Sequence, residues 1–525
     1  MIDNFSRTQV VRKSVVATRG GVVAAQHRRA AEAGAAVLEA GGDAIDAAVA
    51  TSFAIGVVEP WMSGPAAGGA MIAWRADDRR AYAIDYGMRS PGSLDPSDYP
   101  LSGAGRNADL FPWPAVVDER NARGATAVAV PGAVAGMALA HERFGRLPWR
   151  DLLAPAIDLA EQGSLLDWYS GLLVASVARE LAKDADAAAM FLEDGQWPPL
   201  GQWTALTERR LDQRRHAQTL RAIAERGARA FYKGDVARAL VEDVRAKGGC
   251  LSEDDLSNYH ASIGEALAVP YRGGTVFAAP GMTGGPTLEA CLRSLAASDL
   301  AEPAPGPKSY VAYATALDAA YRSRLDGMGD RESPAAPSCT THFSVVDRHG
   351  NLCAVTQTLL SMFGARIVSP STGILLNNGL MWFDPEPGKP NSLGPGKKCL
   401  GNFCPVVGEI ADGRRFALGA SGGRKIIGTV LQIASFMMDH RQSLEEAFHQ
   451  PRIDQSGGAQ VIADVALERA VIDALSARFP TATARRTCFP YAFAVPAAVL
   501  RDGEINMGCT EIMSPWGDAV SERAR

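Results

Sequence analysis

An abrupt change of pattern between residues 327 and 359 constrains this chain more than any other feature of its sequence. Residues 327–338 carry two prolines among charged and small residues, a composition typical of irregular, exposed chain. Residues 341–347 then alternate like a strand, residues 348–351 resemble a turn, and residues 352–359 resemble a second strand. The sequence therefore predicts a loose connection that leads directly into an antiparallel hairpin.

The rest of the chain predicts a mixture of helices and strands. Residues 30–40 are alanine-rich and end at two glycines, and residues 43–58 predict a second helix that is almost wholly buried. Further expected elements are a glycine-rich loop at 63–69, strands at 70–74, 81–86 and 415–420, helical chain over 209–247 broken at Gly227 and Gly234, irregular chain at 301–307, and an apolar helix at 425–438. This pattern indicates a mixed fold with antiparallel pairing in the C-terminal third.

Size and charge limit the kinds of protein this chain can be. Its 525 residues suffice for two to three average domains or one large one. The net charge of −5, without a long basic run, argues against nucleic acid or anionic membrane as partners. Residues 1–20 contain basic side chains but no continuous apolar run, so we expect no secretory signal. We also expect no membrane span, because no stretch of about 18 apolar residues occurs.

The cysteines indicate neither a disulfide scaffold nor a metal site. Eight cysteines occur without a CxxC pair. Cys399 and Cys404 lie five apart, but the nearest histidine is His440, which makes a poor ligand set. Buried free thiols in a reducing compartment explain the cysteines better. We therefore predict a cytoplasmic protein that needs no metal and no cofactor.

A possible nucleophile lies where the irregular connection meets the first strand of the hairpin. Thr340 could simply begin that strand, because threonine is a good strand residue. If the chain were cut before Thr340, its hydroxyl and its new α-amine would lie on adjacent carbons. The α-amine titrates near pH 8 and can act as a general base at neutral pH. The connection would supply the exposed peptide bond that such a cut requires.

Residues 419–423 form a glycine-rich turn between a predicted strand and a predicted helix. Gly422 and Gly423 would let backbone N–H groups point at a developing oxyanion, although a plain tight turn explains them equally well. The same residues match G-x-S-x-G, which makes Ser421 a rival nucleophile with His440, His449 and Asp454 downstream. This α/β-hydrolase alternative is disfavoured, because only about 100 residues follow the motif.

Motifs along nearly the whole chain, in order, resemble the gamma-glutamyltranspeptidase family. The strongest resemblance is to the start of that family's small subunit, at Thr340-Thr341-His342-Phe343-Ser344 and Thr356-Gln357-Thr358-Leu359. Other matching segments are 41–50, 127–136, 230–234, 284–287, 350–351, 373–378, 395–397 and 422–423. The resemblance implies an α+β fold of the N-terminal-nucleophile (Ntn) hydrolase type, a four-layer αββα sandwich.

The resemblance also implies a mechanism. It implies self-cleavage between Cys339 and Thr340, giving a large subunit of residues 1–339 and a small subunit of residues 340–525. The two subunits are expected to remain associated as a heterodimer, with (αβ)₂ as the alternative assembly. Thr340 matches the nucleophile, Thr358 the threonine that orients it, and Gly422 and Gly423 the oxyanion hole. The implied reaction is acyl transfer from a small-molecule amide to water or an amine.

The substrate pocket departs from the glutathione-using members of the family. The arginine that holds the substrate α-carboxylate is replaced by Gly87, with Arg89 two residues further on. Other pocket positions are also replaced, at Leu360, Gly379, Trp382 and the pair Gly401-Asn402. A charged amino-acid head group beside Leu360 and Trp382 would lose its counter-ions, which is expensive in a buried site.

These replacements predict an amidase or acyltransferase with a non-glutamyl acyl donor, similar to the cephalosporin-acylase-like branch of the family. The candidate substrate-binding residues are Arg89, Asn378, Trp382 and Asn402. Two alternatives remain open. One is a true gamma-glutamyl hydrolase or transferase that uses substitute ligands, and the other is an unprocessed, non-catalytic relative that acts as a binding protein.

Overall fold

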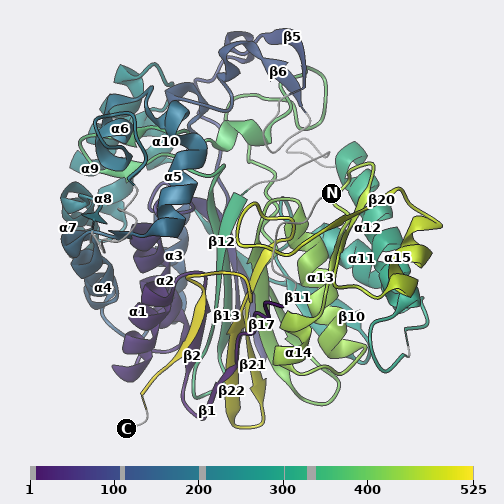
Figure 1. The fold of residues 1–525 in the computed structure, drawn as a ribbon. Helices are drawn as coiled ribbons and strands as arrows, with labels where there is room; N and C mark the ends of the chain where they lie inside the picture. The colour runs from purple at the N-terminus through teal and green to yellow at the C-terminus, as the bar shows by residue number, and fades with distance from the viewer. Residues whose placement is uncertain (1–7, 107–112, 200–208, 301, 328–338, 524–525) are drawn as a thin grey trace.

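Two stacked antiparallel sheets, covered by helices on both outer faces, form the centre of the molecule (Figure 1). The computed structural model describes residues 8–106, 113–199, 209–300, 302–327 and 339–523. The predicted α+β class and its αββα layering are therefore confirmed.

Each of the two central sheets has seven strands, and both sheets combine strands from distant parts of the sequence. In spatial order, the first sheet contains β23 (Asp518–Ser521), β2 (Val22–Ala25), β12 (Cys339–Val346), β13 (Leu352–Leu360), β3 (Gly68–Arg75), β4 (Arg80–Tyr86) and β9 (Ser262–Glu265). The second contains β1 (Val16–Thr18), β22 (Ile505–Thr510), β21 (Val495–Asp502), β17 (Arg415–Ser421), β16 (Val406–Glu409), β11 (Gly274–Ala278) and β10 (Leu267–Tyr271). Strand β12 thus lies between β2, from the N-terminal part of the sequence, and β13, its own hairpin partner.

The helices divide between the two outer faces (Figure 1). Covering the first sheet are α1 (Arg28–Glu39), α2 (Ala44–Val58), α3 (Ala133–Phe144), α4 (Trp149–Gln162), α5 (Trp168–Leu181), α6 (Ala185–Phe191), α7 (Arg214–Arg226), α8 (Arg229–Tyr232), α9 (Asp235–Ala246) and α10 (Glu253–Ser257). Covering the second are α11 (Gly285–Ala296), α12 (Pro307–Gly327), α13 (Lys425–Met438), α14 (Leu444–His449) and α15 (Arg469–Ser476). No helix in the described ranges is both long and apolar enough to cross a membrane.

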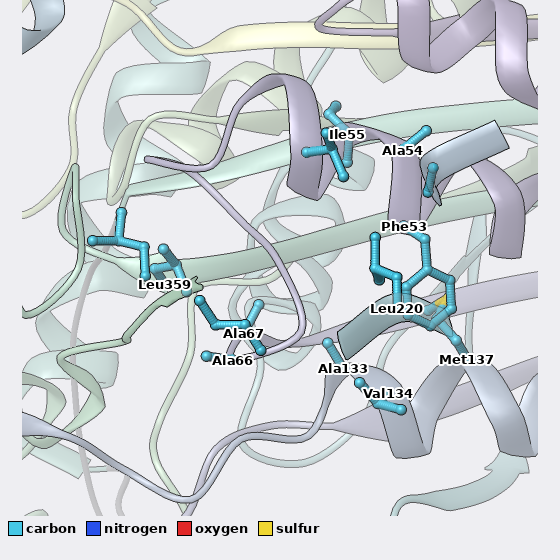
Figure 2. Packing of buried hydrophobic residues seen from close by; sticks show 14 of the residues in the cluster. Phe53, Ala54, Ile55, Ala66, Ala67, Ala133, Val134, Met137, Leu220 and Leu359 are labelled. Carbon is cyan, nitrogen blue, oxygen red and sulfur yellow. The ribbon is translucent and has the colours of Figure 1, made fainter. Parts of the chain in front are cut away.

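Three apolar cores fill the spaces between the four layers, and the period-2 alternation of the strands assigns each side chain to one of them. In β2, Val23 and Ala25 pack beneath the first helical layer, whereas Val22 and Ala24 pack between the sheets. Figure 2 shows the helical side of this arrangement, where Phe53 of α2 meets Met137 of α3 and Leu220 of α7. Strands buried on both faces explain why residues 68–74 and 352–360 are almost continuously apolar or small.

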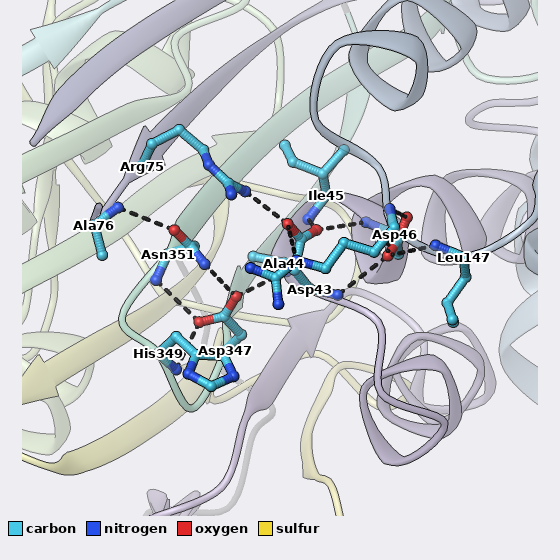
Figure 3. A network of polar contacts seen from close by, with 11 residues as sticks. Asp43, Ala44, Ile45, Asp46, Arg75, Ala76, Leu147, Asp347, His349 and Asn351 are labelled. Carbon is cyan, nitrogen blue, oxygen red and sulfur yellow. Dashed lines mark hydrogen bonds and ion pairs between the residues drawn. The ribbon is translucent and has the colours of Figure 1, made fainter. Parts of the chain in front are cut away.

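A buried polar network ties the turn of the hairpin to the start of α2 (Figure 3). Asp43 caps α2 in a reciprocal capping box with Asp46, and its second oxygen pairs with Arg75 of β3 at 2.6 Å. In the turn, Asp347 accepts hydrogen bonds from the backbone N–H of Ala44 at 3.2 Å and from the side chain of Asn351 at 2.6 Å. The hairpin that carries Thr340 is therefore anchored at its far end.

Most of the predicted elements are present within two residues of the expected bounds. The expected breaks at Gly227 and Gly234 are confirmed, and both glycines have positive φ, +74° and +111°. The hairpin is confirmed as β12 and β13. One helix, the 21-residue α12 that follows the proline-rich segment, was not predicted from the sequence. The predicted irregular chain at 328–338 lies outside the described residues.

Candidate active site

The start of β12 and the end of β17 lie at the same end of the sandwich, although they belong to different sheets. His342 of β12 faces Gly419 of β17 so closely that a Cβ on Gly419 would lie 2.4 Å from the imidazole Cε1. Further along, the Ser344 hydroxyl donates to the carbonyl of Ala497, the residue paired with Gly419. The Gln26 side chain bonds both the Thr341 hydroxyl, at 3.3 Å, and the Ser421 hydroxyl, at 2.7 Å, so the start of β12 lies toward the Gly422 end of β17.

Thr340 is buried in the sheet, and its hydroxyl is left unsatisfied. Its side chain is 1% exposed, and its Oγ1 has no hydrogen-bond partner among the described residues. A buried hydroxyl without a hydrogen-bond partner costs about 1–3 kcal/mol of folding free energy, so the position of Thr340 lowers the stability of the fold. The register between β12 and β13 is irregular between Cys339 and Thr341, which changes the direction of the chain at this residue.

Thr358 lies beside Thr340 on the adjacent strand. Register places Cys339 opposite Leu360 and Thr341 opposite Gln357, so Thr340 and Thr358 occupy neighbouring positions on the face between the sheets. The Thr358 hydroxyl accepts a hydrogen bond from the backbone N–H of Leu360 at 2.8 Å. Leu360 has φ +89°, a left-handed conformation that is strained for a leucine. This bond fixes the Thr358 oxygen at the point where β13 ends.

Gly422 and Gly423 form the turn between β17 and α13. Both adopt positive φ, +128° and +67°, which a side chain would strain. A Cβ on Gly422 would also lie 2.9 Å from the Cα of Ala494. The pair precedes the N-terminus of α13, whose N-cap residue Arg424 makes no side-chain cap. Backbone N–H groups in such a turn, together with the helix dipole, suit a developing negative charge.

A chain of buried polar side chains supports both halves of this arrangement. The Thr341 hydroxyl lies 3.3 Å from Oε2 of Glu59, the C-cap residue of α2, and 3.3 Å from Oε1 of Gln26. Gln26 in turn donates to the hydroxyl of Ser421 at 2.7 Å and to the carbonyl of Val495 at 2.8 Å. Burial raises the pKa of Glu59 to about 8, and the Thr341 hydrogen bond only partly opposes that rise. Glu59 is therefore a neutral acid over most of the physiological range.

The alternative hypothesis that Ser421 is a nucleophile on an α/β-hydrolase elbow is wrong. Ser421 is part of β17, and its hydroxyl accepts the hydrogen bond from Gln26. The imidazole of His440 bonds the carbonyl of Glu302 at 2.9 Å, and that of His449 bonds the carbonyl of Glu445 at 2.8 Å. Within the described chain no hydrogen bond joins either histidine to Ser421, so these residues form no Ser–His pair.

His342 is buried between the sheets and is uncharged at neutral pH. Its ring nitrogens contact the hydroxyls of Thr356 and Ser344, each at 2.9 Å. Burial lowers its pKa to about 3, because the low-dielectric layer disfavours the imidazolium. Although it is two residues from Thr340, His342 is unsuited to accept a proton at neutral pH.

The predicted pocket residues Trp382 and Asn402 lie in the apolar layer between the sheets. Trp382 is fully buried and packs edge-on against Phe403 with ring centroids 5.4 Å apart. Neither its indole N–H nor the Asn402 side-chain NH₂ has a partner within the described chain. The Asn402 oxygen accepts a hydrogen bond from the buried guanidinium of Arg324 at 3.0 Å. This layer thus offers a ligand an apolar surface and two hydrogen-bond donors, the indole N–H of Trp382 and the side-chain NH₂ of Asn402.

The predicted residues Asn378 and Arg89 are placed differently. Asn378 is buried, with its amide donating to the carbonyl of Ala122 and to the hydroxyl of Ser361 and its oxygen accepting from the N–H of Ser361. Arg89 is exposed, and its guanidinium lies 3.5 Å from the carbonyl oxygen of Gly396. Asn378 therefore shapes the loop after β13, whereas Arg89 lies on the surface beside Gly396.

Lys398 is a cation that the sequence analysis missed. A Cβ on Gly87 would lie 3.2 Å from the Lys398 side-chain Cε, so this lysine fills the space beside that glycine. Its ammonium forms an ion pair with Asp85. The only sequence signal was the match at residues 395–397, which ends one residue before it. Arg324 gave no signal, because its contacts with residues 283, 287, 401 and 402 cross the fold.

Seven of the eight cysteines have described side chains, and all seven have free thiols. Five of them are buried, as predicted. The side chain of Cys339, on the other side of the predicted cleavage site, lies outside the described side chains.

The sequence model of the gamma-glutamyltranspeptidase family matches residues 30–339 and 333–503. The chain belongs to this family. As a gamma-glutamyltranspeptidase family member it is an enzyme of the Ntn-hydrolase type, and the position of Thr340 is consistent with the threonine nucleophile of that type.

Relatives of this family member include both acylases and glutathione hydrolases. It is 35% identical to the acylase ACY 1 proenzyme of Pseudomonas sp. (strain V22) over 497 residues, covering 87% of this chain and 86% of that protein. It is 30% identical to the glutathione hydrolase proenzyme of Bacillus subtilis (strain 168) over 495 residues, covering 84% and 81%. The crystal structure of cephalosporin acylase from Bacillus halodurans has the same fold, with a TM-score of 0.84, 23% identity and full coverage of both chains.

Proposed function

We propose that this enzyme is a self-processing threonine amidohydrolase or acyltransferase whose acyl donor lacks the amino-acid head group of a glutamyl compound. The observation that carries the proposal is the buried, unpartnered hydroxyl of Thr340 at the start of β12, at the same end of the sandwich as the Gly422–Gly423 turn. The names of two relatives, both proenzymes, support processing, and the 35% identity to an acylase supports the choice of donor.

Self-cleavage would use the same atoms as turnover. In the intact chain, the Thr340 hydroxyl attacks the carbonyl carbon of Cys339, and the C–N bond breaks as the proton moves to the departing nitrogen. This shift frees the Thr340 α-amine, and water then hydrolyses the ester, which releases the Cys339 carboxylate and restores the Thr340 hydroxyl. This amine, with a pKa of about 8, is then the general base of the mature enzyme.

In turnover, the α-amine removes the hydroxyl proton as Thr340 Oγ1 attacks the amide carbonyl of the substrate. The N–H groups of Gly422 and Gly423 stabilise the oxyanion, a contribution worth roughly 3–4 kcal/mol per donor. Collapse breaks the C–N bond, the leaving amine takes the proton, and the acyl group remains as an ester on Thr340. Water or a second amine then attacks that ester and restores the hydroxyl.

The pocket favours a donor without charges beside the reacting carbonyl. Leu360, Gly379 and Trp382 are fully buried and apolar at positions where the glutamyl-specific resemblance calls for polar ligands. Each lost charge-assisted hydrogen bond costs roughly 1.5–3 kcal/mol. Two such losses, if additive, lower kcat/KM for a glutamyl donor by about 10²–10⁴-fold.

A panel of anilides that share one leaving group tests this proposal on the processed enzyme. It compares γ-glutamyl anilide with glutaryl and simple aliphatic acyl anilides, with release of the aniline as the readout. We expect the γ-glutamyl compound to be the poorest donor. The donor proposal is wrong if that compound gives the highest kcat/KM, and the enzyme proposal is wrong if no acyl group is ever found on Thr340.

One observation favours the second candidate, a true gamma-glutamyl hydrolase or transferase. The Lys398 ammonium lies beside Gly87, the position of the family's carboxylate-binding arginine, and could hold an α-carboxylate there. In that case Lys398→Gln would lower activity selectively toward the γ-glutamyl anilide in the same panel. An equal effect of Lys398→Gln on all donors would exclude this role. The cytoplasmic location and the heterodimer remain predictions.

A further inference from the structure

A buried hydrogen-bond chain crosses three layers of the fold at the end of the sandwich that holds the proposed nucleophile. Glu59 ends α2 in the helical layer, Thr341 belongs to β12 of the first sheet, and Gln26 follows β2 of the same sheet. The Gln26 amide reaches the second sheet, where it donates to the hydroxyl of Ser421 in β17. All four residues are at most 7% exposed. The chain therefore links the strand of the nucleophile to the strand that leads into the glycine turn.

The hydrogen atoms of this chain can be counted, and the count depends on the proton of Glu59. The Thr341 hydroxyl lies 3.3 Å from Oε2 of Glu59 and 3.3 Å from Oε1 of Gln26, and it has only one hydrogen to donate. When Glu59 is neutral, it donates to Thr341, and Thr341 donates to Gln26. When Glu59 is ionised, its carboxylate competes with Gln26 Oε1 for that single hydrogen. The carboxylate is the stronger acceptor, so Gln26 Oε1 is left without a donor in the described chain.

The surroundings of Glu59 offer its charge no cation. Glu59 forms no ion pair within the described part of the chain, and burial raises its pKa to about 8. Titratable side chains of neighbouring elements include Tyr169 of α5, Asp167 at the N-cap of α5, and His27 beside Gln26. Burial raises the pKa of Tyr169, and the charges of Glu59 and Asp167 add to that rise, although a hydrogen bond to a second tyrosine opposes it. Burial lowers the pKa of His27 to about 4. Neither Tyr169 nor His27 therefore changes charge between about pH 7 and 9.5.

We propose that neutral Glu59 is a positioning residue for the nucleophile: through Thr341 and Gln26 it fixes β12 against β17, and loss of its proton to solvent releases that link. The inference rests on the proposed function, which assigns the nucleophile to Thr340 and the oxyanion to the Gly422–Gly423 turn. Because the described contact of Glu59 is with Thr341, its effect on catalysis is indirect. A misplacement of about 1 Å between reacting groups can lower a rate on the order of 10²-fold, so a weakened link is visible in turnover.

The shape of the pH profile tests this role on the processed enzyme. For the fastest anilide of the donor panel, kcat is measured from pH 7 to pH 9.5 in the unmodified enzyme and in Glu59→Gln. The α-amine of Thr340 loses its proton near pH 8, which raises kcat in both proteins. In the unmodified enzyme, ionisation of Glu59 opposes that rise. The ratio of kcat at pH 9.5 to kcat at pH 7 should therefore be about tenfold higher in Glu59→Gln, whose side-chain amide donates to Thr341 at every pH.

Substitutions at Thr341 test whether the effect passes through its hydroxyl. Thr341→Ser keeps a donor and an acceptor and should retain the ratio of the unmodified enzyme. Thr341→Val has a similar shape without the hydroxyl, so the link is broken at every pH and the ratio should match that of Glu59→Gln. Glu504→Gln, which changes a 76% exposed carboxyl, is the matched control and should leave the ratio unchanged. Ratios within one variant are insensitive to partial loss of folded enzyme.

Infrared spectroscopy follows the same proton without a substrate. Between pH 7 and pH 9.5, Thr340→Ala protein should lose an absorption band of a protonated carboxyl group, and the double variant with Glu59→Gln should show no such loss. Equal infrared changes in the two proteins would overturn the inference, as would equal kcat ratios in the unmodified enzyme and Glu59→Gln, or a Thr341→Val ratio equal to that of the unmodified enzyme. Turnover of no anilide by correctly processed protein would instead contradict the amidohydrolase proposal, so the two failures are distinguishable.

Discussion

The buried carboxyl of Glu59 should make the stability of this protein depend on pH in a way that one substitution removes. Burial raises the pKa of Glu59 from 4.5 to about 8 in the folded protein. The folded state keeps this proton between those pH values, whereas the unfolded chain releases it. The stabilisation is therefore fully present below pH 4.5 and is lost as the pH rises through about 8.

The magnitude follows from the two pKa values. A tenfold change in proton affinity is worth about 1.4 kcal/mol, so the loss between pH 4.5 and 8 is about 5 kcal/mol. Unfolding entropy is about 2.1 cal/mol/K per residue, or about 1.1 kcal/mol/K for 525 residues. The Glu59 contribution to Tm should therefore fall by about 4 °C over this range.

The assay compares Glu59→Gln with its parent in the Thr340→Ala background, in which we expect the chain to remain uncut. Tm is measured by calorimetry at pH 4.5 and pH 9 for both proteins, and the change in Tm of the variant is compared with that of its parent. Effects of all other titrating groups are the same in both proteins and cancel. Glutamine keeps the neutral, hydrogen-bonding shape beside Thr341, so the variant should gain on its parent at pH 9. Glu504→Gln, at a 76% exposed site, is the control. Parallel pH profiles for Glu59→Gln and its parent would refute the reasoning.

Three further predictions concern the site and its surroundings. N-terminal sequencing of purified protein should return Thr-Thr-His-Phe-Ser from a second fragment of 525 − 339 = 186 residues, and a single intact chain after long incubation would contradict this. Thr340→Ala should abolish processing and lower activity on the order of 10⁴-fold or more, whereas Ser421→Ala should still be processed; the opposite pattern on a denaturing gel would revive the serine nucleophile. Arg324→Met should lower Tm by several degrees, because it leaves two buried carbonyl groups without a donor. It should also raise KM more than it lowers kcat, because Asn402 loses the hydrogen bond that holds its side chain. An unchanged KM would show that Arg324 does not support the substrate pocket.

The sequence was sufficient to predict the order of the elements around the site, because each of them has a local signal. The hairpin alternates, the wholly buried α2 begins with a capping box, and the glycine pair follows β17. The residues that the sequence missed act across the fold. Glu59 and Thr341 are 282 positions apart, and Arg324 reaches Asn402 over 78 positions. No periodicity reveals which side chains meet across the fold, so Glu59, Arg324 and Lys398 became visible only in three dimensions.

The position of β12 in its sheet determines how the processed protein would behave as an assembly. This strand pairs with β2 on one side and β13 on the other, and β2 and β3 of the first sheet come from the segment before the cut. A cut before Thr340 removes one covalent bond but no strand neighbour. Separation of the two fragments would then require the central sheet to be dismantled, so subunit exchange between processed molecules should be no faster than global unfolding. Fragments synthesised separately would have to fold around each other, and the intact precursor avoids that step by folding before it is cut.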